Sequence, residues 1–251
     1  MQLKIKNEII ENCRFLKLKG ILNHFEEEET AASDYEDFLL RLLRYEIIEK
    51  EKRSIECRMR SAHFPYRKYL EDLDISALPK TIQKRLPEIA TLEFIEKGQN
   101  IIMIGNPGTG KTHIALGLGI KACLQGYKVL FTTVPLLVTE LKECNSEQHL
   151  RYFQNRFEKY DLVIADELGY ISFDREGTDL LFTNLSLRAG RKSMIVTSNL
   201  TFARWTEVFG DPAITSAIVD RLTHKAIIVD MNGDSYRLKE TLEINGNEMS
   251  T

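Results

Sequence analysis

Hydrophobic positions follow a helical period in the first part of the chain. Up to about residue 60 the apolar residues recur three and four positions apart, and this part contains one glycine, Gly20, and no proline. Ser33 and Glu36 fit a capping box, in which each side chain bonds the other residue's backbone N–H. The pattern predicts a small helical domain over residues 1–66. The apolar run that shows the period best is Phe38, Leu39, Leu42, Leu43, Ile47 and Ile48.

From about residue 98 the pattern changes to short β-branched runs that alternate with helical stretches. Strands that are nearly continuous in apolar residues are typical of parallel sheets buried on both faces. We therefore predict an α/β fold, with a mostly parallel sheet flanked by helices and the small helical N-terminal domain before it. Residues 67–97 are expected to be a linker that packs on the sheet domain of residues 98–242, and residues 243–251 a disordered tail. The predicted strands are residues 100–104, 128–134, 161–166 and 192–199, with a further strand inside 218–237.

Composition limits the function classes only loosely. The chain is 43% hydrophobic and 28% charged, as in globular proteins with a sizeable core, and its formal net charge of −3 gives no overall basic signature for nucleic acid. A local basic patch would still be enough. The four cysteines form no CxxC pair, which argues against a zinc site and favours a reduced, cytoplasmic setting. We see no signal peptide and no apolar run long enough to span a membrane.

The clearest chemical motif is GNPGTGKT, residues 105–112, which matches G-x-x-x-x-G-K-[ST] between a predicted strand and a predicted helix. Its glycines let backbone N–H groups wrap a phosphate, Lys111 can reach the β- and γ-phosphates, and Thr112 can ligate Mg²⁺. An incidental glycine-rich turn would not explain the strand before it and the helix after it. The predicted ATP contacts are Gly105, Asn106, Pro107, Gly108, Thr109, Gly110, Lys111, Thr112 and His113.

Two later strands end in polar residues. LVIADE, residues 162–167, ends in a pair of acids: Asp166 is expected to bind Mg²⁺, and Glu167 to be the catalytic base for the attacking water. An acidic surface turn is the alternative. In an open parallel sheet ligands collect at the carboxyl ends of strands, so Asn199 after IVTS is expected to reach the γ-phosphate or the water, although a helix-capping role stays open.

These elements, in this order, resemble the AAA+ ATPases, with GNPGTGKT as Walker A, LVIADE as Walker B and Asn199 as sensor 1. Over roughly residues 1–240 the match narrows to the IstB-type transposition helper ATPases, relatives of the DnaC helicase loaders and the DnaA initiator. The resemblance implies an ATPase encoded beside an insertion-sequence transposase. Such an ATPase forms a homo-oligomer on duplex DNA with ATP, remodels the target DNA, and recruits or activates its cognate transposase.

The resemblance also assigns two arginines near the end of the chain. Arg221 in IVDRL falls at the arginine-finger position, which implies that ATP sites lie at subunit interfaces and that a neighbouring copy completes each one. Arg237 in DSYR matches sensor 2, which acts on the nucleotide of its own subunit. From the residues alone, salt bridges with Asp220 and Asp234 are the alternative.

Three groups of basic residues are candidates for contact with the DNA backbone, which would give salt-dependent binding with little sequence preference. Solvated helix faces, or cations placed at helix C-termini, explain them as well. Aromatic residues for base stacking are sparse near them, which favours duplex over single-stranded DNA. The candidates are Arg53, Arg58 and Arg60 in the N-terminal region, Lys142, Arg151 and Arg156 between the second and third strands, and Arg188, Arg191 and Lys192 before the fourth.

Three other functions are weighed against a transposition helper. A DnaC-like loader would use the same ATPase to deliver a replicative helicase to DNA. A nucleotide switch would hold ATP without useful turnover, but the acid pair at residues 166 and 167 argues against it. A small-molecule kinase would need an acceptor pocket, for which the sequence offers no candidate.

Overall fold

The computed structural model describes residues 2–144 and 146–236, so Arg237 and the predicted tail at 243–251 lie outside the described part. The chain divides into two compact units, residues 1–57 and 58–251. This division falls inside a helix, earlier than the boundary expected at residue 66. The reason is that the last turn of this helix and the residue after it are bound into the second unit. Arg58 donates to the Cys123 carbonyl at 2.8 Å, and Ala62, just after the helix, is fully buried and its carbonyl accepts the Phe131 N–H at 2.8 Å.

The first unit is all helical, as predicted, with α1 (Gln2–Phe15), α2 (Lys19–Ala31) and α3 (Tyr35–Ser61). Backbones of α2 and α3 approach closely at Gly20, where an added Cβ would lie 2.5 Å from the Tyr45 carbonyl oxygen. The Gly20 N–H donates to the buried carboxylate of Glu46 at 2.7 Å, and Arg53 donates to the same carboxylate at 2.8 Å. Glycine is therefore required at the point where the two helices meet.

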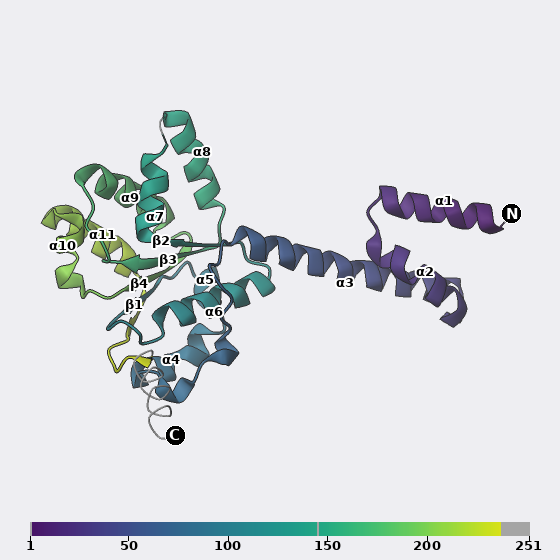
Figure 1. Cartoon of the computed structure of the whole chain (residues 1–251), viewed down its shortest axis with the longest axis horizontal. Helices are drawn as coiled ribbons and strands as arrows, with labels where there is room; N and C mark the ends of the chain where they lie inside the picture. The colour runs from purple at the N-terminus through teal and green to yellow at the C-terminus, as the bar shows by residue number, and fades with distance from the viewer. Residues whose placement is uncertain (1, 145, 237–251) are drawn as a thin grey trace, which may run out of the picture. The chain divides into compact units, whose positions relative to one another are not determined.

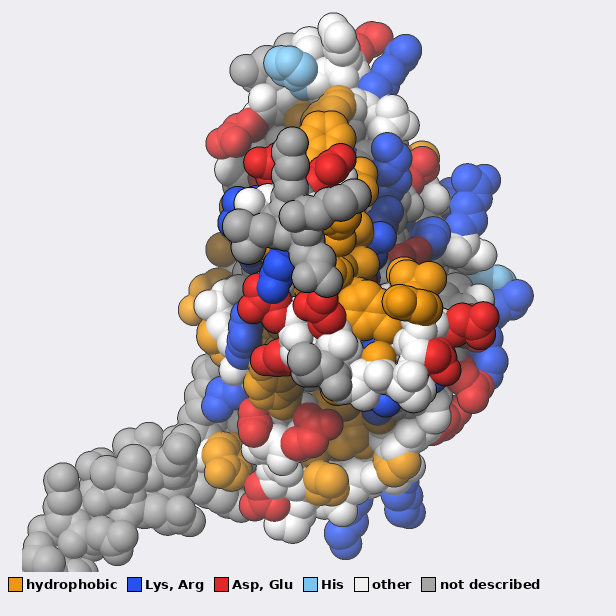
Figure 2. Space-filling model, turned by 90° about the vertical axis from the view of Figure 1, so that its right-hand side faces the viewer, with side chains coloured by type: hydrophobic (Ala, Val, Ile, Leu, Met, Phe, Trp, Pro, Cys, Tyr) orange, Lys and Arg blue, Asp and Glu red, His pale blue; other side chains and the backbone are white. Residues whose placement is uncertain are grey.

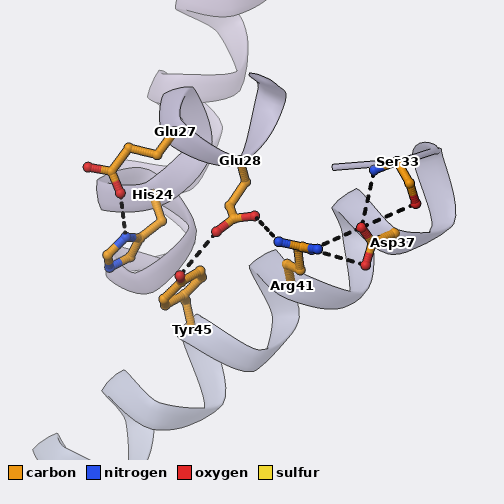
Figure 3. A network of polar contacts seen from close by, with 7 residues as sticks. All are labelled: His24, Glu27, Glu28, Ser33, Asp37, Arg41 and Tyr45. Carbon is orange, nitrogen blue, oxygen red and sulfur yellow. Dashed lines mark hydrogen bonds and ion pairs between the residues drawn. The ribbon is translucent and has the colours of Figure 1, made fainter. Parts of the chain in front are cut away.

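The residues that cap the start of α3 differ from the predicted pair, so the prediction of a capping box of Ser33 with Glu36 is wrong. Asp34 Oδ1 accepts the backbone N–H of Asp37 at 2.8 Å. Asp37 Oδ2 in turn accepts the N–H of Ser33 at 3.2 Å (Figure 3). The side-chain oxygen that caps the N-terminus of α3 therefore comes from Asp34. The sequence pattern favours the hydroxyl of Ser33 for this role.

A polar network joins α2 to α3 (Figure 3). Glu28 accepts hydrogen bonds from the Tyr45 hydroxyl at 3.0 Å and from Arg41 at 3.4 Å, although its side chain is mostly buried. The Tyr45 ring also stacks on His24, with ring centroids 3.8 Å apart. The hydrogen bond to Glu28 raises the pKa of Tyr45, and the hydrogen bond from Arg41 lowers the pKa of Asp37. Polar contacts therefore help to hold α2 against α3.

Most of the apolar run that predicted α3 does not pack inside its unit. Leu42 is buried at 4% exposure, whereas Leu39, Leu43, Ile47 and Ile48 are between 46% and 56% exposed. The helical period was predicted correctly, but its apolar side is largely open to solvent.

The second unit is built on one parallel sheet, which confirms the predicted α/β fold (Figure 1). The strand order is β2-β3-β4-β1-β5, and β1 lies between β4 and β5, with Ile101 opposite both Ile195 and Ile227. Each predicted strand is present, including one inside residues 218–237. The strands are β1 (Ile101–Ile104), β2 (Val129–Thr133), β3 (Leu162–Leu168), β4 (Ser193–Ser198) and β5 (Ile227–Asp230).

Helices cover both faces of this sheet, so successive residues of a central strand enter two different cores. In β1, Ile101 and Met103 belong to one buried cluster and Ile102 and Ile104 to the other. This explains why the strands are apolar at nearly every position rather than at alternate ones. The first cluster contains residues of α4 (Lys80–Ile89), α5 (Glu93–Glu96) and α6 (Lys111–Leu124). The second contains residues of α7 (Val134–Lys142), α8 (Glu147–Glu158), α9 (Arg175–Arg188), α10 (Thr206–Phe209) and α11 (Pro212–Thr223).

Residues 67–97 are part of the folded core rather than a linker lying on it. They form the short helices η1 (Leu70–Asp72) and η2 (Ile75–Ala77), followed by α4 and α5. Ile82 and Ile89 are at most 1% exposed, and the Thr81 hydroxyl donates to the Asp230 carbonyl at the end of β5. The segment therefore closes one side of the sheet beside β5. A last short helix, η3 (Phe202–Arg204), lies between β4 and α10.

Acidic and basic side chains are both scattered over the face shown in Figure 2, in keeping with the small net charge. Within the part of the chain that the structure describes, no helix has both the length and the apolar character that crossing a membrane requires.

Candidate functional site

The loop between β1 and α6 folds as the glycine pattern requires. Gly108 and Gly110 have φ values of 79° and 90°, a left-handed conformation that glycine adopts without steric cost. At Gly105 an added Cβ would lie 2.3 Å from the Met231 carbonyl carbon, so the backbones touch there. The loop ends directly at the first residue of α6, and this arrangement leaves backbone N–H groups at a helix N-terminus, where an anion is stabilised.

Lys111 is the first residue of α6 and bends back over this loop. Its Nζ donates to the carbonyls of Gly105 at 2.7 Å and Asn106 at 2.6 Å, and the residue is 7% exposed. These carbonyls hold the ammonium group beside the N–H groups of the loop. The positive charge therefore lies where a phosphate bound to the loop would need it.

Thr112 and Asp166 come together from α6 and β3. The Thr112 hydroxyl lies 3.1 Å from both carboxylate oxygens of Asp166, a residue that is 3% exposed. The donor set is one hydroxyl and one carboxylate, and no group of three or more His, Cys, Asp or Glu side chains with metal-binding geometry occurs among the described residues. This set fits Mg²⁺, which takes one or two protein oxygens and completes its shell with phosphates and water.

Glu167 lies at the irregular end of β3. The register of β3 against β4 shifts between Ala165 and Leu168, and Glu167 has a φ of 64°, which is unusual for a residue with a side chain. Its backbone N–H donates to the Thr197 hydroxyl at 3.0 Å. The carboxylate is exposed next to the buried Asp166, as a base that meets water must be.

Asn199 follows β4 directly and is exposed. The last paired residues of β3 and β4 are Leu168 and Ser198, so Asn199 and Glu167 lie at the same edge of the sheet. The N-cap of the next short helix is Thr201, which removes the capping role that the sequence left open for Asn199.

Arg221 lies near the end of α11 and is exposed. Its guanidinium carbon lies 5.1 Å from the centroid of the Phe182 ring on α9, a cation–π contact. In the described residues no ion pair joins it to Asp220 or Asp234, the partners that the sequence suggested as an alternative. Its charge is therefore not neutralised by an acid of its own chain within that part. Arg237, the predicted sensor 2, lies outside the described residues.

Arg188 corrects the prediction of a basic surface cluster. The residue is 1% exposed, and its guanidinium donates to the carbonyls of Phe157 at 2.6 Å, Tyr160 at 2.9 Å and Ser193 at 3.2 Å. Burial lowers its pKa to about 10, so it remains charged at neutral pH. Arg188 ties α8 and its following turn to β4 and cannot contact DNA, so its inclusion among the DNA candidates is wrong.

The other candidate basic residues differ in how freely they could meet a phosphate. Lys142 pairs with Asp174 at 2.6 Å, Lys192 with Asp161 at 2.6 Å, and Arg151 with Glu147 at 3.7 Å. Arg53 bonds Glu46, and Arg58 donates to the Cys123 carbonyl at 2.8 Å. By contrast Arg60, Arg156 and Arg191 are exposed and form no ion pair with any described residue, although Arg156 lies over the Phe153 ring.

Sequence reasoning missed three features around the loop. The first is Thr197, whose only signal was a polar residue inside an apolar strand. The second is the chain after β5, where the Tyr236 N–H donates to the Gly108 carbonyl at 3.0 Å. The third is the partner of His113, predicted to contact ATP, whose Nε2 lies 2.9 Å from the Tyr69 carbonyl oxygen. Residues 67–97 therefore form part of the surroundings of this site.

A parallel sheet that carries this loop, the acid pair at the end of β3 and an asparagine directly after β4 defines an AAA+ P-loop protein that binds ATP. Comparison then identifies the group within that class: the chain belongs to the family of IstB-like ATP binding proteins, whose model matches residues 12–244. Both statements confirm what the sequence resemblance implied.

The relatives fit this assignment. A protein named for ATP binding in insertion sequence IS5376 of Geobacillus stearothermophilus is 37% identical over 240 residues, 94% of this chain and 96% of that one. One named for ATP binding in insertion sequence IS21 of Pseudomonas aeruginosa is 37% identical over 229 residues, 90% and 86% of the two chains. Among solved structures, AMPPCP-bound DnaA from Aquifex aeolicus superposes with a TM-score of 0.55 at 22% identity, over 72% of this chain and 55% of that one. The last likeness concerns the fold alone.

Proposed function

We propose that this chain is a Mg²⁺-dependent ATPase that oligomerises on duplex DNA with ATP and assists the transposase of an insertion sequence. Membership of the IstB-like family, and the insertion-sequence names of its relatives, support the association with an insertion sequence. The observation on which the enzymatic part rests is the contact of Thr112 with Asp166, with the exposed Glu167 next in the chain. A protein that only holds ATP would not need that second acid.

The phosphates would lie against the backbone N–H groups of residues 105–110, with the Lys111 ammonium beside the β- and γ-phosphates. Thr112 and Asp166 would hold Mg²⁺, which offsets negative charge on the phosphates when it is bound. Each of these groups already lies within a few ångströms of the loop. Binding therefore requires Lys111 to leave two loop carbonyls, but no rearrangement of the sheet.

Hydrolysis would begin when Glu167 accepts a proton from water, whose oxygen attacks the γ-phosphorus. The bond from that phosphorus to the β–γ bridging oxygen breaks, and ADP leaves with the electron pair. Asn199, at the same edge of the sheet, would orient the water or the γ-phosphate. The proton on Glu167 then passes to solvent, which its exposed side chain reaches.

Charge that develops on the γ-phosphate would be stabilised by Arg221 of a neighbouring copy and by Arg237 of the same chain. The exposed guanidinium of Arg221, without an acidic partner among the described residues, supports a role outside its own subunit. This role makes turnover depend on assembly. It links ATP hydrolysis to oligomerisation on DNA.

DNA binding would use exposed arginines that no acid neutralises. Arg60, Arg156 and Arg191 satisfy this condition in the described residues, and Arg151 is weakly paired and 77% exposed. Contacts of this kind bind phosphates of any sequence and weaken as salt is raised.

The test combines phosphate release with particle size, measured with and without duplex DNA in the presence of Mg²⁺ and ATP. We expect DNA and ATP together to give both the largest particles and the fastest release, and Glu167→Gln to assemble without release. Equal, negligible release by both proteins under every condition would contradict the ATPase. Capture of the cognate transposase, but not of a replicative helicase, by the immobilised full chain would separate a transposition helper from a helicase loader.

A further inference from the structure

Thr197 lies inside β4 and has a hydroxyl with two partners that both belong to the acid pair of β3. The residue is 2% exposed. Its Oγ1 donates to Asp166 Oδ1, and it accepts the backbone N–H of Glu167 at 3.0 Å. A single side chain of the neighbouring strand thus bonds the predicted Mg²⁺ ligand and the predicted base.

The two bonds depend on each other. A threonine hydroxyl has one hydrogen to donate, and here the carboxylate of Asp166 receives it. The Thr197 oxygen can then only accept a hydrogen bond from the Glu167 N–H, through its lone pairs. Because both bonds are satisfied in a buried place, neither the hydroxyl nor the Asp166 carboxylate can rotate freely.

The backbone of Glu167 needs such a contact. Its φ of 64° lies in a region that residues with a side chain seldom adopt, and it interrupts the register of β3 with β4 between Ala165 and Leu168. At that interruption the bond to Thr197 replaces the ladder bond that the Glu167 N–H would otherwise form with a strand neighbour. Unusual backbone conformations persist where the surroundings fix them, and they are concentrated at functional sites.

We propose that Thr197 is a positioning residue, which fixes the backbone at Glu167 so that the carboxylate is presented to the attacking water while Asp166 remains oriented toward Thr112. This inference rests on the proposed ATPase function. Thr197 is buried and acts through the two acids that it bonds. Asn199 follows two positions later, directly after the end of β4, so this strand positions all three groups of the site.

The test replaces Thr197 with valine, which has nearly the same shape and no hydroxyl, and with serine, which keeps the hydroxyl. We expect Thr197→Val to lower kcat for ATP about 10- to 100-fold, the size of effect seen when partners that orient metal ligands and bases are removed. The KM for ATP and the affinity for ATP measured without Mg²⁺ should change less than threefold. Thr197→Ser should retain at least half of the wild-type kcat.

Two controls separate positioning from a general loss of structure. Thr132→Val removes a buried hydroxyl from β2, on the other side of β3, where it bonds a backbone carbonyl only, and should leave kcat unchanged. In a Glu167→Gln background, Thr197→Val should lower the residual rate by clearly less than it lowers kcat in the wild-type background, because one of the two acids through which it acts is already lost and only the bond to Asp166 remains to be removed.

Three results would overturn the inference: wild-type kcat in Thr197→Val, an equal loss in Thr197→Ser, or a full additional loss in the Glu167→Gln background. If Thr197→Val does not fold, Thr197→Ala in the same comparison decides. Failure of the ATPase proposal is distinguishable, since the wild-type protein would then release no phosphate with or without DNA, and the positioning role would fall with it. Turnover by the wild type together with normal turnover by Thr197→Val refutes the positioning role alone.

Discussion

The hydroxyl of Thr112 lies 3.1 Å from each carboxylate oxygen of Asp166, across 54 positions of sequence. The two side chains therefore bring their oxygen atoms to the same place, as a cation bound by both of them would require. We expect Thr112→Val to weaken ATP binding in Mg²⁺ at least tenfold and to leave binding in EDTA nearly unchanged. Isothermal titration of ATP with and without Mg²⁺ measures both.

Thr112→Ser is the matched control, because it keeps the oxygen and should keep the dependence on Mg²⁺. If Thr112→Val bound ATP equally well with and without the metal ion, and as tightly as the wild type does in Mg²⁺, Thr112 would not be a ligand.

Lys111 is the second group to test. Its ammonium group donates to two loop carbonyls, at 2.7 Å and 2.6 Å. Lys111→Ala should weaken ATP binding by about 100-fold, since a charge-assisted contact to phosphate is worth roughly 1.5–3 kcal/mol. Lys121→Ala removes the same charge from the other end of α6 and should bind ATP normally. Unchanged affinity in Lys111→Ala would reject the phosphate-loop assignment.

Glu167→Gln should bind ATP and remain assembled, but lose turnover. The hydrogen bond to Thr197 comes from the backbone N–H, so glutamine keeps the local conformation and removes only the ability to accept a proton. General bases contribute about 10²- to 10⁴-fold, and single-turnover phosphate release should fall by that factor. Wild-type release in this variant would exclude Glu167 as the base.

The parts of this site that could be predicted are those whose functional residues are adjacent in the sequence. GNPGTGKT is a single loop between a strand and a helix, and Asp166 and Glu167 follow directly from an apolar run, so their neighbourhood required only the parallel order of the strands. Thr112 and Asp166 were each expected to bind Mg²⁺, and the structure places their side chains in contact.

What could not be predicted depends on contacts between distant segments. The surroundings of Arg188 consist of three carbonyls from two other segments, and nothing near Arg188 in the sequence distinguishes it from the exposed Arg191. In the sequence, Thr197 is one more β-branched residue of a strand. Its role is visible only from its contacts with Asp166 and Glu167 of β3. At the start of α3, Ser33 and Asp34 are both good capping residues, and the sequence alone does not decide between them.

A comparison of Arg188 with Arg191 tests by protein stability whether Arg188 is a structural residue. Arg188→Met keeps much of the side-chain volume but leaves three carbonyls without their donor, which should cost about 3 kcal/mol. For a unit of this size that corresponds to a fall of roughly 6–12 °C in Tm. Arg191→Met is the control and should stay within about 0.5 kcal/mol of the wild type, as exposed substitutions do. Equal Tm values for the two variants would mean that Arg188 is not a structural residue.

Variants of Arg221 test whether one subunit forms a complete ATP site or whether two subunits share it. Its guanidinium is exposed above the Phe182 ring, so Arg221→Ala should fold normally and bind ATP with wild-type affinity. If the neighbour's arginine stabilises the transition state, turnover in the assembled variant should fall by about 10³-fold or more. Phe182→Leu, which removes the ring and keeps the arginine, shows how much of any loss comes from the stacking contact.

Mixing two inactive variants then tests whether Arg221 acts on another copy. Arg221→Ala subunits retain an intact loop and acid pair, whereas Glu167→Gln subunits retain the arginine. In a mixed assembly, interfaces that combine the acids of the first with the arginine of the second should regain ATP turnover, because both halves of the site are then present at one nucleotide. Phosphate release is measured across a series of mixing ratios in the presence of duplex DNA. Recovery that peaks at intermediate ratios supports action in trans, and a flat, inactive series, with mixed assembly verified by differently tagged subunits, would show that Arg221 serves its own subunit or none.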